Sequence, residues 1–185
     1  MTTPEATTSR KTPPQGREAI VAAVLDSATA LFAERGPAST SIRDIAERAG
    51  VNHGLVFRHF GTKDKLVVEV LDQLGAASAN RELSSTDVQL SLHWTVIARC
   101  LLDGYPVGEL QHRFPVMNRL LHLAQQHHDE PADAALAAAH AAALELGWQL
   151  FGPFLRNAAG LHELTPEQLQ LAADERARTI LTPEP

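Results

Sequence analysis

Cysteine is nearly absent from this sequence, and no uninterrupted apolar run is long enough to cross a membrane. Cys100 is the only cysteine, so an internal disulfide is impossible and nothing indicates an oxidising compartment. The N-terminus has no apolar stretch of the kind that a secretory signal needs. Residues 134–155 are rich in alanine but include His140, Glu145 and Gln149, which are costly at the centre of a bilayer. We therefore expect a cytoplasmic protein without a membrane partner.

Aromatic residues are also scarce, at 5% of the 185 residues, and no segment shows the apolar and polar alternation that is typical of a strand. Alanine and leucine are abundant instead, and both favour helices. With 44% apolar residues, the chain can bury a substantial core. The sequence predicts an all-α protein of about nine helices.

Positive charge is in short supply, because the formal net charge is −6. Such a balance ordinarily argues against nucleic acid as a partner, since phosphate contacts need Lys and Arg. Residues 1–70 contain 9 Lys and Arg against 8 Asp and Glu, a net charge of about +1, whereas residues 71–185 contain 7 against 14, about −7. The acidic residues are thus concentrated in residues 71–185, and the charge of residues 1–70 does not argue against a nucleic-acid partner.

The first part of the chain contains strong signals for the starts and ends of helices. Residues 1–16 hold five Thr and three Pro, a composition that predicts a flexible N-terminal arm. Ser41 and Asn52 are each suited to cap the N-terminus of a helix, and Gly50 is suited to end one. The sequence predicts helices over residues 17–35, 42–49, 53–60 and from 63 onward.

The remainder of the chain also predicts helices. Their expected ranges are 86–103, 106–114, 115–127, 131 to about 160, and 166 to about 181. The long alanine-rich helix that starts at Pro131 is expected to be interrupted near Gly152 and Pro153.

The stretch GVNHGLVFRHFGTKDKL, residues 50–66, is too polar for a core and too patterned for a loop. Two short helices joined by a turn at Gly50 and resting on a third helix form the arrangement that places a helix in a DNA major groove. The second short helix carries side chains that can contact base edges and phosphates. Those expected to face outward are Asn52, His53, Leu55, Arg58 and His59.

The run SIRDIAERAGVNHGLVFRHFGTKDKL resembles the N-terminal DNA-binding domain of the TetR (tetracycline repressor) family of bacterial transcription regulators. The matching features are Thr40-Ser41, Ile45-Ala46, Ala49-Gly50-Val51, Gly54, Phe57, His59-Phe60, Lys63 and Leu66. The resemblance covers roughly residues 17–70, and the family's helical ligand domain is compatible with the rest. It implies a helix-turn-helix DNA-binding domain at residues 17–62 and a helical effector-binding and dimerisation domain at residues 63–185.

The resemblance also implies a role for particular residues. Thr40, Ser41 and Lys63 would hold phosphates, and Arg43 would contact a base or a phosphate. His53 and Leu55 would face base edges, and Arg58 and His59 would lie near the DNA backbone. The full set of expected DNA-binding residues is Thr40, Ser41, Arg43, Asn52, His53, Gly54, Leu55, Phe57, Arg58, His59 and Lys63.

Two residues depart from the family's pattern. Asn52 stands where the family usually has Ser or Thr, and it keeps the oxygen that caps the helix. Phe57 stands where the family usually has tyrosine, so the hydroxyl that contacts phosphate is missing. We expect this second change to weaken non-specific DNA affinity.

The resemblance implies a homodimeric repressor that a small-molecule effector releases from a near-palindromic DNA operator. The dimer interface is expected at Leu144, Trp148, Phe151, Phe154, Leu155, Leu169 and Ile180. The effector pocket is expected at His93, Trp94, Ile97, Leu101, Tyr105, Met117, Leu120 and Leu121. The sequence leaves open that many of these residues are ordinary core.

The nine histidines raise an alternative from another class, a helical small-molecule or metal-binding protein whose DNA-binding head is weak or inactive. Two metal ligands on one helix need a spacing of three or four residues. The residue four after His122 is Gln126, and His127 and His128 point in different directions. No nucleophile, base and orienting group can be placed together from the sequence. We therefore expect no metal, no cofactor and no enzymatic activity.

Overall fold

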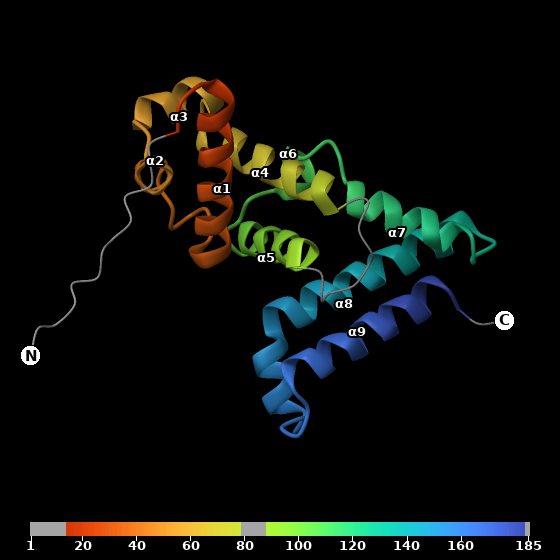
Figure 1. Cartoon of the computed structure of the whole chain (residues 1–185). Helices are drawn as coiled ribbons and strands as arrows, with labels where there is room; N and C mark the ends of the chain where they lie inside the picture. Colours follow the sequence, from red (N-terminus) through yellow and green to blue (C-terminus); the bar gives the residue numbers. More distant parts are fainter. Residues whose placement is uncertain (1–13, 79–87, 184–185) are drawn as a thin grey trace, which may run out of the picture.

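The computed structural model describes residues 14–78 and 88–183, and all regular structure within them is helical (Figure 1). The helices are α1 (Arg17–Arg35), α2 (Ile42–Ala49), α3 (His53–Phe60), α4 (Lys63–Ser78), α5 (Val88–Leu102), α6 (Val107–Leu110), α7 (Pro115–Gln125), α8 (Pro131–Ala158) and α9 (Pro166–Leu181). The nine described helices confirm the predicted fold class. Most of the predicted arm, and the predicted helix start at residue 86, lie outside the described residues.

The helices pack around two apolar cores that share α5. The first core joins α1–α4 and extends past residue 62 into α5, which adds Val96 and Cys100. The second core joins α7, α8 and α9 to the other end of α5, through Leu90 and Trp94. In Figure 1, α1–α3 lie at one end of the molecule and α7–α9 at the other. The helix α5 therefore contributes side chains to both cores.

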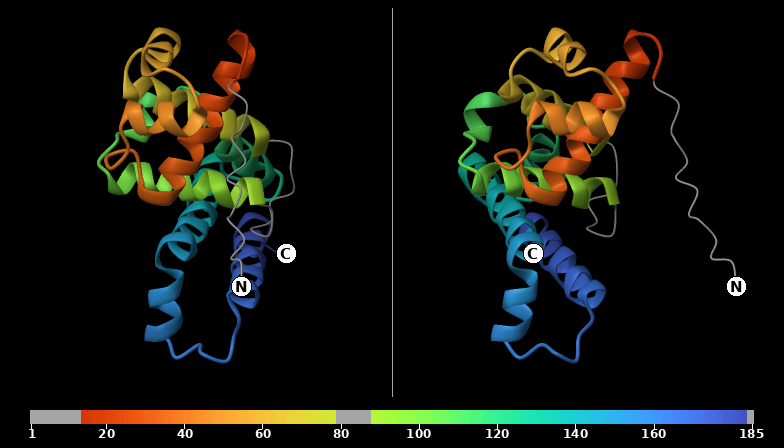
Figure 2. Two further views of the ribbon diagram at one scale, coloured as in Figure 1. Left: turned by 60° about the vertical axis from the view of Figure 1, so that its left-hand side comes forward. Right: turned by 90° about the vertical axis from the view of Figure 1, so that its left-hand side faces the viewer.

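The two last helices, α8 and α9, lie side by side, and their adjoining ends project from the rest of the chain (Figure 2). The predicted interruption of α8 near Pro153 is wrong, because the helix continues from Pro131 to Ala158. It bends in its second half instead (Figures 1 and 2). Proline removes one helical hydrogen bond and crowds the preceding turn, which favours a bend. None of the described helices is long and apolar enough to cross a membrane.

Short-range hydrogen bonds determine where α2 and α3 begin. The Ser41 hydroxyl accepts from the N–H of Asp44 at 3.1 Å, and the Asp44 carboxylate accepts from the N–H of Ser41 at 2.9 Å. Gly50 ends α2 with φ 68° and ψ 31°, a conformation that glycine adopts without strain. Asn52 Oδ1 then accepts from the N–H of Gly54 at 2.8 Å and caps α3. The predicted caps are confirmed at all three positions.

Long-range bonds hold the turn between α1 and α2. Just after α5, Asp103 Oδ2 accepts from the N–H of Ala38 at 2.7 Å. From α4, Lys63 Nζ donates to the carbonyl of Pro37 at 2.9 Å. Gly36 has φ 78°, and a Cβ at that position would collide with the Asp103 carboxylate. The close approach of Asp103 to this turn therefore requires glycine.

A pair of carboxyl side chains lies between α8 and α9. Asp174 is only 7% exposed, and Glu145 on α8 lies within hydrogen-bonding reach of it. Burial raises the pKa of Glu145 to about 7, and the adjacent Asp174 carboxyl contributes to the rise. Gln170 Nε2 donates to Glu145 Oε2 at 3.2 Å. Near neutral pH, Glu145 thus binds a proton far more readily than an exposed glutamate does.

We expect Asp103→Ala to lower the free energy of unfolding by about 1 kcal/mol, because the substitution removes the acceptor that holds Ala38. Urea unfolding followed by circular dichroism measures the change. Glu109→Ala, which removes an exposed carboxylate from α6, is the control. Equal effects of the two substitutions would contradict a role for the Asp103–Ala38 bond.

We expect Glu145 to make stability depend on pH in a defined direction. Because its pKa is raised on folding, its stabilising contribution is present below its ordinary pKa of 4.5 and is lost as the pH rises to about 7. The unfolding free energy of Glu145→Gln relative to the unmodified protein should rise by about 1–2 kcal/mol across that range, less than the full shift implies because Glu145 is only half-buried. Chemical unfolding at pH 4.5, 6 and 8 measures it, and exposed Glu163→Gln is the matched control. A pH-independent difference would refute the burial of this charge.

Candidate nucleic-acid interface and pocket

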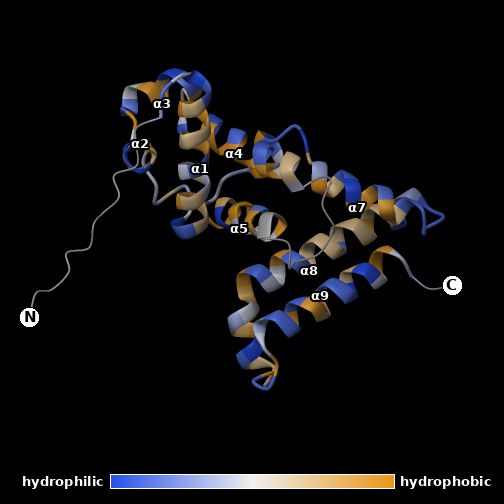
Figure 3. Cartoon of the chain, viewed as in Figure 1, coloured by the Kyte–Doolittle hydropathy of each residue, from blue (hydrophilic) through white to orange (hydrophobic). Residues whose placement is uncertain are grey.

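The outward face of α3, together with the start of α2, forms a polar and aromatic surface at the outer edge of the molecule (Figures 1 and 3). Val56 and Phe60 of α3 point inward and are buried in the first core. The predicted contact residues that are exposed on this surface are Ser41, Arg43, Asn52, His53, Gly54, Phe57 and Arg58. Leu55 and His59 are half-buried beside them.

Two arginines of this region are committed to ion pairs within the chain. Arg35 pairs with Asp44 at 2.8 Å, and Arg48 pairs with Glu34 at 2.8 Å. The N–H of Ser41, its hydroxyl and the Arg35 guanidinium together hold the pKa of Asp44 below its usual value. Among the described ion pairs none involves Arg43 or Arg58. These two exposed guanidinium groups are the cations that this surface can offer to phosphates or bases.

Two predicted phosphate contacts have other partners in the structure. Thr40 is only 1% exposed, and its hydroxyl donates to the carbonyl of Gly36 at 2.8 Å, so its assignment to a phosphate does not fit. The side chain satisfies a turn carbonyl from within the fold. Lys63 is half-buried, with Nζ close to the carbonyls of Pro37 and Thr40. Sequence reasoning missed this internal role, because the partners come from a turn more than twenty residues away.

Gly54 has a structural reason to be glycine. A Cβ at this position would lie 3.1 Å from Asn52 Oδ1, the oxygen that caps α3. Its exposed backbone also leaves room for close approach from outside. The glycine therefore allows the tight cap that starts α3.

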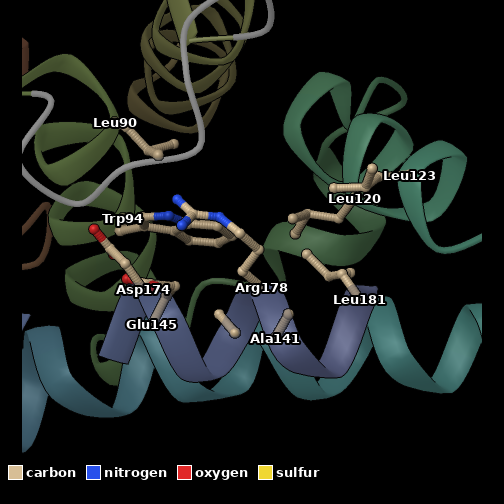
Figure 4. A pocket seen from close by; sticks show the side chains of 10 residues that line it. Leu90, Trp94, Leu120, Leu123, Ala141, Glu145, Asp174, Arg178 and Leu181 are labelled. Carbon is tan, nitrogen blue, oxygen red and sulfur yellow. The ribbon is translucent and has the colours of Figure 1, made fainter. Parts of the chain in front are cut away.

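The described chain has a small, partly open cavity of about 50 Å³ between α5, α7, α8 and α9 (Figure 4). Its apolar wall comes from Leu90, Leu120, Leu123 and Leu181, with the carboxyl pair and Arg178 as its charged members. Trp94 crosses the space between them (Figure 4).

Only two of the predicted pocket residues, Trp94 and Leu120, line this cavity. Leu101 is 50% exposed, and Tyr105 packs against the first core. The other predicted residues that do not line the cavity are His93, Ile97, Met117 and Leu121. Sequence reasoning also missed Glu145, Asp174 and Arg178. The spacing of four between Asp174 and Arg178 places them on one face of α9, but only the fold turns that face toward Trp94.

His93 lies behind Trp94, with the two rings stacked 5.9 Å apart between centroids. It is 3% exposed, and neither ring nitrogen has a hydrogen-bond partner among the described residues. Burial lowers the pKa of His93 to about 4, so the ring is neutral at physiological pH. His93 therefore supports Trp94 from the core side and does not reach the cavity.

The projecting ends of α8 and α9 carry exposed apolar side chains. Phe151 and Phe154 are 51% and 66% exposed. Leu169, one of the expected interface residues, is 6% exposed and faces its own chain. Leu171, two residues further along α9, is 54% exposed and was missed. Of the other predicted interface residues, Trp148 and Leu155 are half-buried, and Leu144 and Ile180 pack against the second core.

The described residues contain no group of three or more His, Cys, Asp or Glu side chains that could hold a metal ion.

Comparisons with known proteins agree with this arrangement. The family profile TetR_N, described as "Bacterial regulatory proteins, tetR family", matches residues 24–70. The chain is 53% identical to the HTH-type transcriptional repressor Rv3405c of Mycobacterium tuberculosis, over 99% of this chain and 100% of that protein.

Solved structures share the fold. A TetR-like transcriptional regulator from Rhodococcus sp. RHA1 superposes with a TM-score of 0.55 at 21% identity, over 90% of this chain and 96% of that one. NalD, the secondary repressor of the MexAB-OprM multidrug efflux pump in Pseudomonas aeruginosa, gives 0.54 at 21% identity, over 90% and 98%. At such identity these two show the fold alone. The full-length match to Rv3405c shows that this chain belongs to the TetR family of bacterial regulatory proteins.

Proposed function

We propose that this protein is a homodimeric transcriptional repressor that acts in the cytoplasm. One observation carries the proposal: the capped helix α3 presents His53, Phe57 and Arg58 outward beside Arg43. These residues lie within the segment that matches the TetR family profile. Such a helix fits the major groove, where side chains reach base edges and the flanking phosphates. The name of the full-length relative, a repressor, favours repression over activation.

The proposed dimer places two copies of α3 on successive major grooves of a near-palindromic operator. A two-fold dimer of this kind spans half-sites roughly 34–36 Å apart. The exposed apolar residues Phe151, Phe154 and Leu171 support self-association through α8 and α9, since large exposed apolar patches mark interfaces. Residues 71–185 are acidic and repel DNA, so the DNA contacts are made by the N-terminal part of each subunit.

In the proposed regulation, residues 17–62 bind DNA, and residues 63–185 dimerise and bind a small-molecule effector. The cavity beside Trp94 is the site that we assign to the effector. Effector binding would favour a spacing of the two heads that does not fit the operator. A coupling free energy of about 1–3 kcal/mol would change operator affinity by roughly 5- to 150-fold.

The first test is binding of the purified protein to the DNA that flanks its own gene, at two salt concentrations and against random duplex. Tighter binding to the flanking DNA, weaker at higher salt, supports the proposal, because released counterions make DNA affinity depend on salt. No binding at low salt would favour the alternative of a small-molecule-binding protein with an inactive head.

We expect Arg43→Ala and His53→Ala each to reduce the preference for the operator over random duplex by about 1–3 kcal/mol, because contacts to base edges distinguish sequences. Fluorescence anisotropy with both duplexes measures the preference. Arg99→Ala, which removes an exposed arginine from α5, is the control for lost charge. An equal loss on both duplexes would reassign the residue to a phosphate contact.

We expect Phe154→Asp to make the protein monomeric, because a carboxylate would be buried at the centre of the proposed interface. Size-exclusion chromatography with light scattering measures the mass. Leu102→Asp, a matched change of a 62% exposed residue at the end of α5, should leave the dimer intact. A dimeric Phe154→Asp protein would show that the interface lies elsewhere.

A further inference from the structure

The cavity between α5, α7, α8 and α9 has a mostly apolar wall. The apolar members of the lining are Leu90, Leu120, Leu123, Ala141, Ala177 and Leu181. Figure 4 shows the carboxyl groups of Glu145 and Asp174 at one end of the lining and the lining leucines of α7 and α9 at the other. An occupant of this cavity therefore lies mainly against hydrocarbon.

Trp94 is the lining residue that points to a ligand. Its side chain is only 5% exposed, yet its Nε1–H has no hydrogen-bond partner among the described residues. A buried donor without an acceptor costs free energy, and folded cores normally avoid it. An oxygen acceptor placed against this indole nitrogen would remove the cost. We therefore expect an occupant to carry such an oxygen.

Arg178 determines how an oxygen reaches the indole. In Figure 4 its side chain lies along the indole of Trp94, and both residues line the cavity. Arg178 is exposed, and a long side chain of this kind can move toward solvent while its guanidinium stays hydrated. The cavity of about 50 Å³ holds only a few atoms, so a larger occupant has to move Arg178 aside. That movement would also open the space next to the indole.

The environment of Glu145 shows that the cavity disfavours charge. Burial is the main cause that raises the pKa of Glu145 to about 7, so the site favours the uncharged form of its own side chain. Glu145 Oε2 already accepts from Gln170 Nε2 at 3.2 Å, and Asp174 beside it already has an interaction partner within the chain. Neither carboxyl group is therefore vacant for a cationic ligand. A charged occupant would lose its hydration against the apolar wall, which costs several kcal/mol where no partner compensates it.

We propose that this cavity binds a small uncharged carbonyl compound. The carbonyl oxygen accepts from Trp94 Nε1, and the hydrocarbon lies against the leucines. This assignment names the chemical class of the effector and therefore rests on the proposed function.

The test uses four probes that share one branched skeleton: 3-pentanone, the alkene 2-ethyl-1-butene, the cation 3-aminopentane and the anion 2-ethylbutanoate. The ketone and the alkene differ only in whether the double bond ends in an oxygen or in a methylene group. Equilibrium dialysis of the full chain measures the affinity for each probe. The ketone should bind at least about ten-fold more tightly than either ion. Tighter binding of either ion, or no binding of the ketone, overturns the proposal.

The indole N–H resonances report directly whether the oxygen reaches Trp94. The chain has two tryptophans, so Trp148→Phe identifies the Trp94 resonance. In the unsubstituted protein, the ketone should move the Trp94 resonance downfield, because a new acceptor deshields the donated proton. The alkene should bind without this shift, and the Trp148 resonance is the internal control. Equal shifts with the ketone and the alkene overturn the assignment of the oxygen to Trp94.

Substitutions separate the indole N–H from general effects on the cavity. Trp94→Phe should lower the ratio of ketone to alkene affinity about ten-fold, because it removes the donor and keeps an aromatic ring. Arg178→Gln should keep this ratio, as should Arg176→Gln, an exposed control on the same helix. A ratio that falls with Arg178→Gln alone would assign the donor to Arg178 and overturn the role of Trp94. If Trp94→Phe does not fold, the resonance shifts of the unsubstituted protein still decide the assignment.

Operator binding in the same samples separates this proposal from the proposed function. Ketone binding at Trp94 that weakens operator binding supports both. Ketone binding without any change in operator affinity supports the ligand class and contradicts effector-controlled release from this cavity. Sequence-specific operator binding without binding of the ketone contradicts the ligand class and leaves the regulator intact.

Discussion

The DNA-binding surface depends on one constraint: α3 has only eight residues and cannot form a stable helix alone. Its position is fixed by burying Val56 and Phe60 in a core that α1, α2, α4 and α5 build around them. Loss of any helix that packs in this core would leave α3 without the contacts that hold it in place. Because α5 also belongs to the second core, the two parts of the chain share a structural member.

That shared helix connects the cavity to the head by a short physical route. Near one end of α5, Leu90 and Trp94 line the cavity, and just beyond the other, Asp103 holds the turn that leads into α2. A close-packed helix transmits displacement along its axis, since interiors do not compress easily. A ligand that repositions Trp94 therefore acts on the helix that leads directly into Asp103, the residue that anchors Ala38. Contiguous packing of this kind provides a mechanism for coupling, whereas distance alone does not.

The sequence predicted the features that depend on local chemistry. Ser41, Gly50 and Asn52 determine the ends of α2 and α3 through bonds to residues no more than four positions away, so composition and spacing were enough. It could not show that Thr40 turns inward, that Lys63 binds the carbonyl of Pro37, or that Leu171 rather than Leu169 is exposed. Those outcomes depend on residues distant in the chain. The sequence could not predict the residues that line the cavity for the same reason, since four helices contribute to it.

Two features that are unfavourable in a folded core lie at the cavity, where a bound ligand can relieve them. A half-buried glutamate with a raised pKa and an indole N–H without an acceptor among the described residues each oppose folding at neutral pH, yet both lie on one small cavity. Stable cores avoid such groups singly, and natural proteins keep them mainly at functional sites. The indole N–H needs a hydrogen-bond acceptor. A ligand that supplies this acceptor gains binding energy from a cost that the folded chain already bears, so a few atoms can suffice to shift the balance between two conformations.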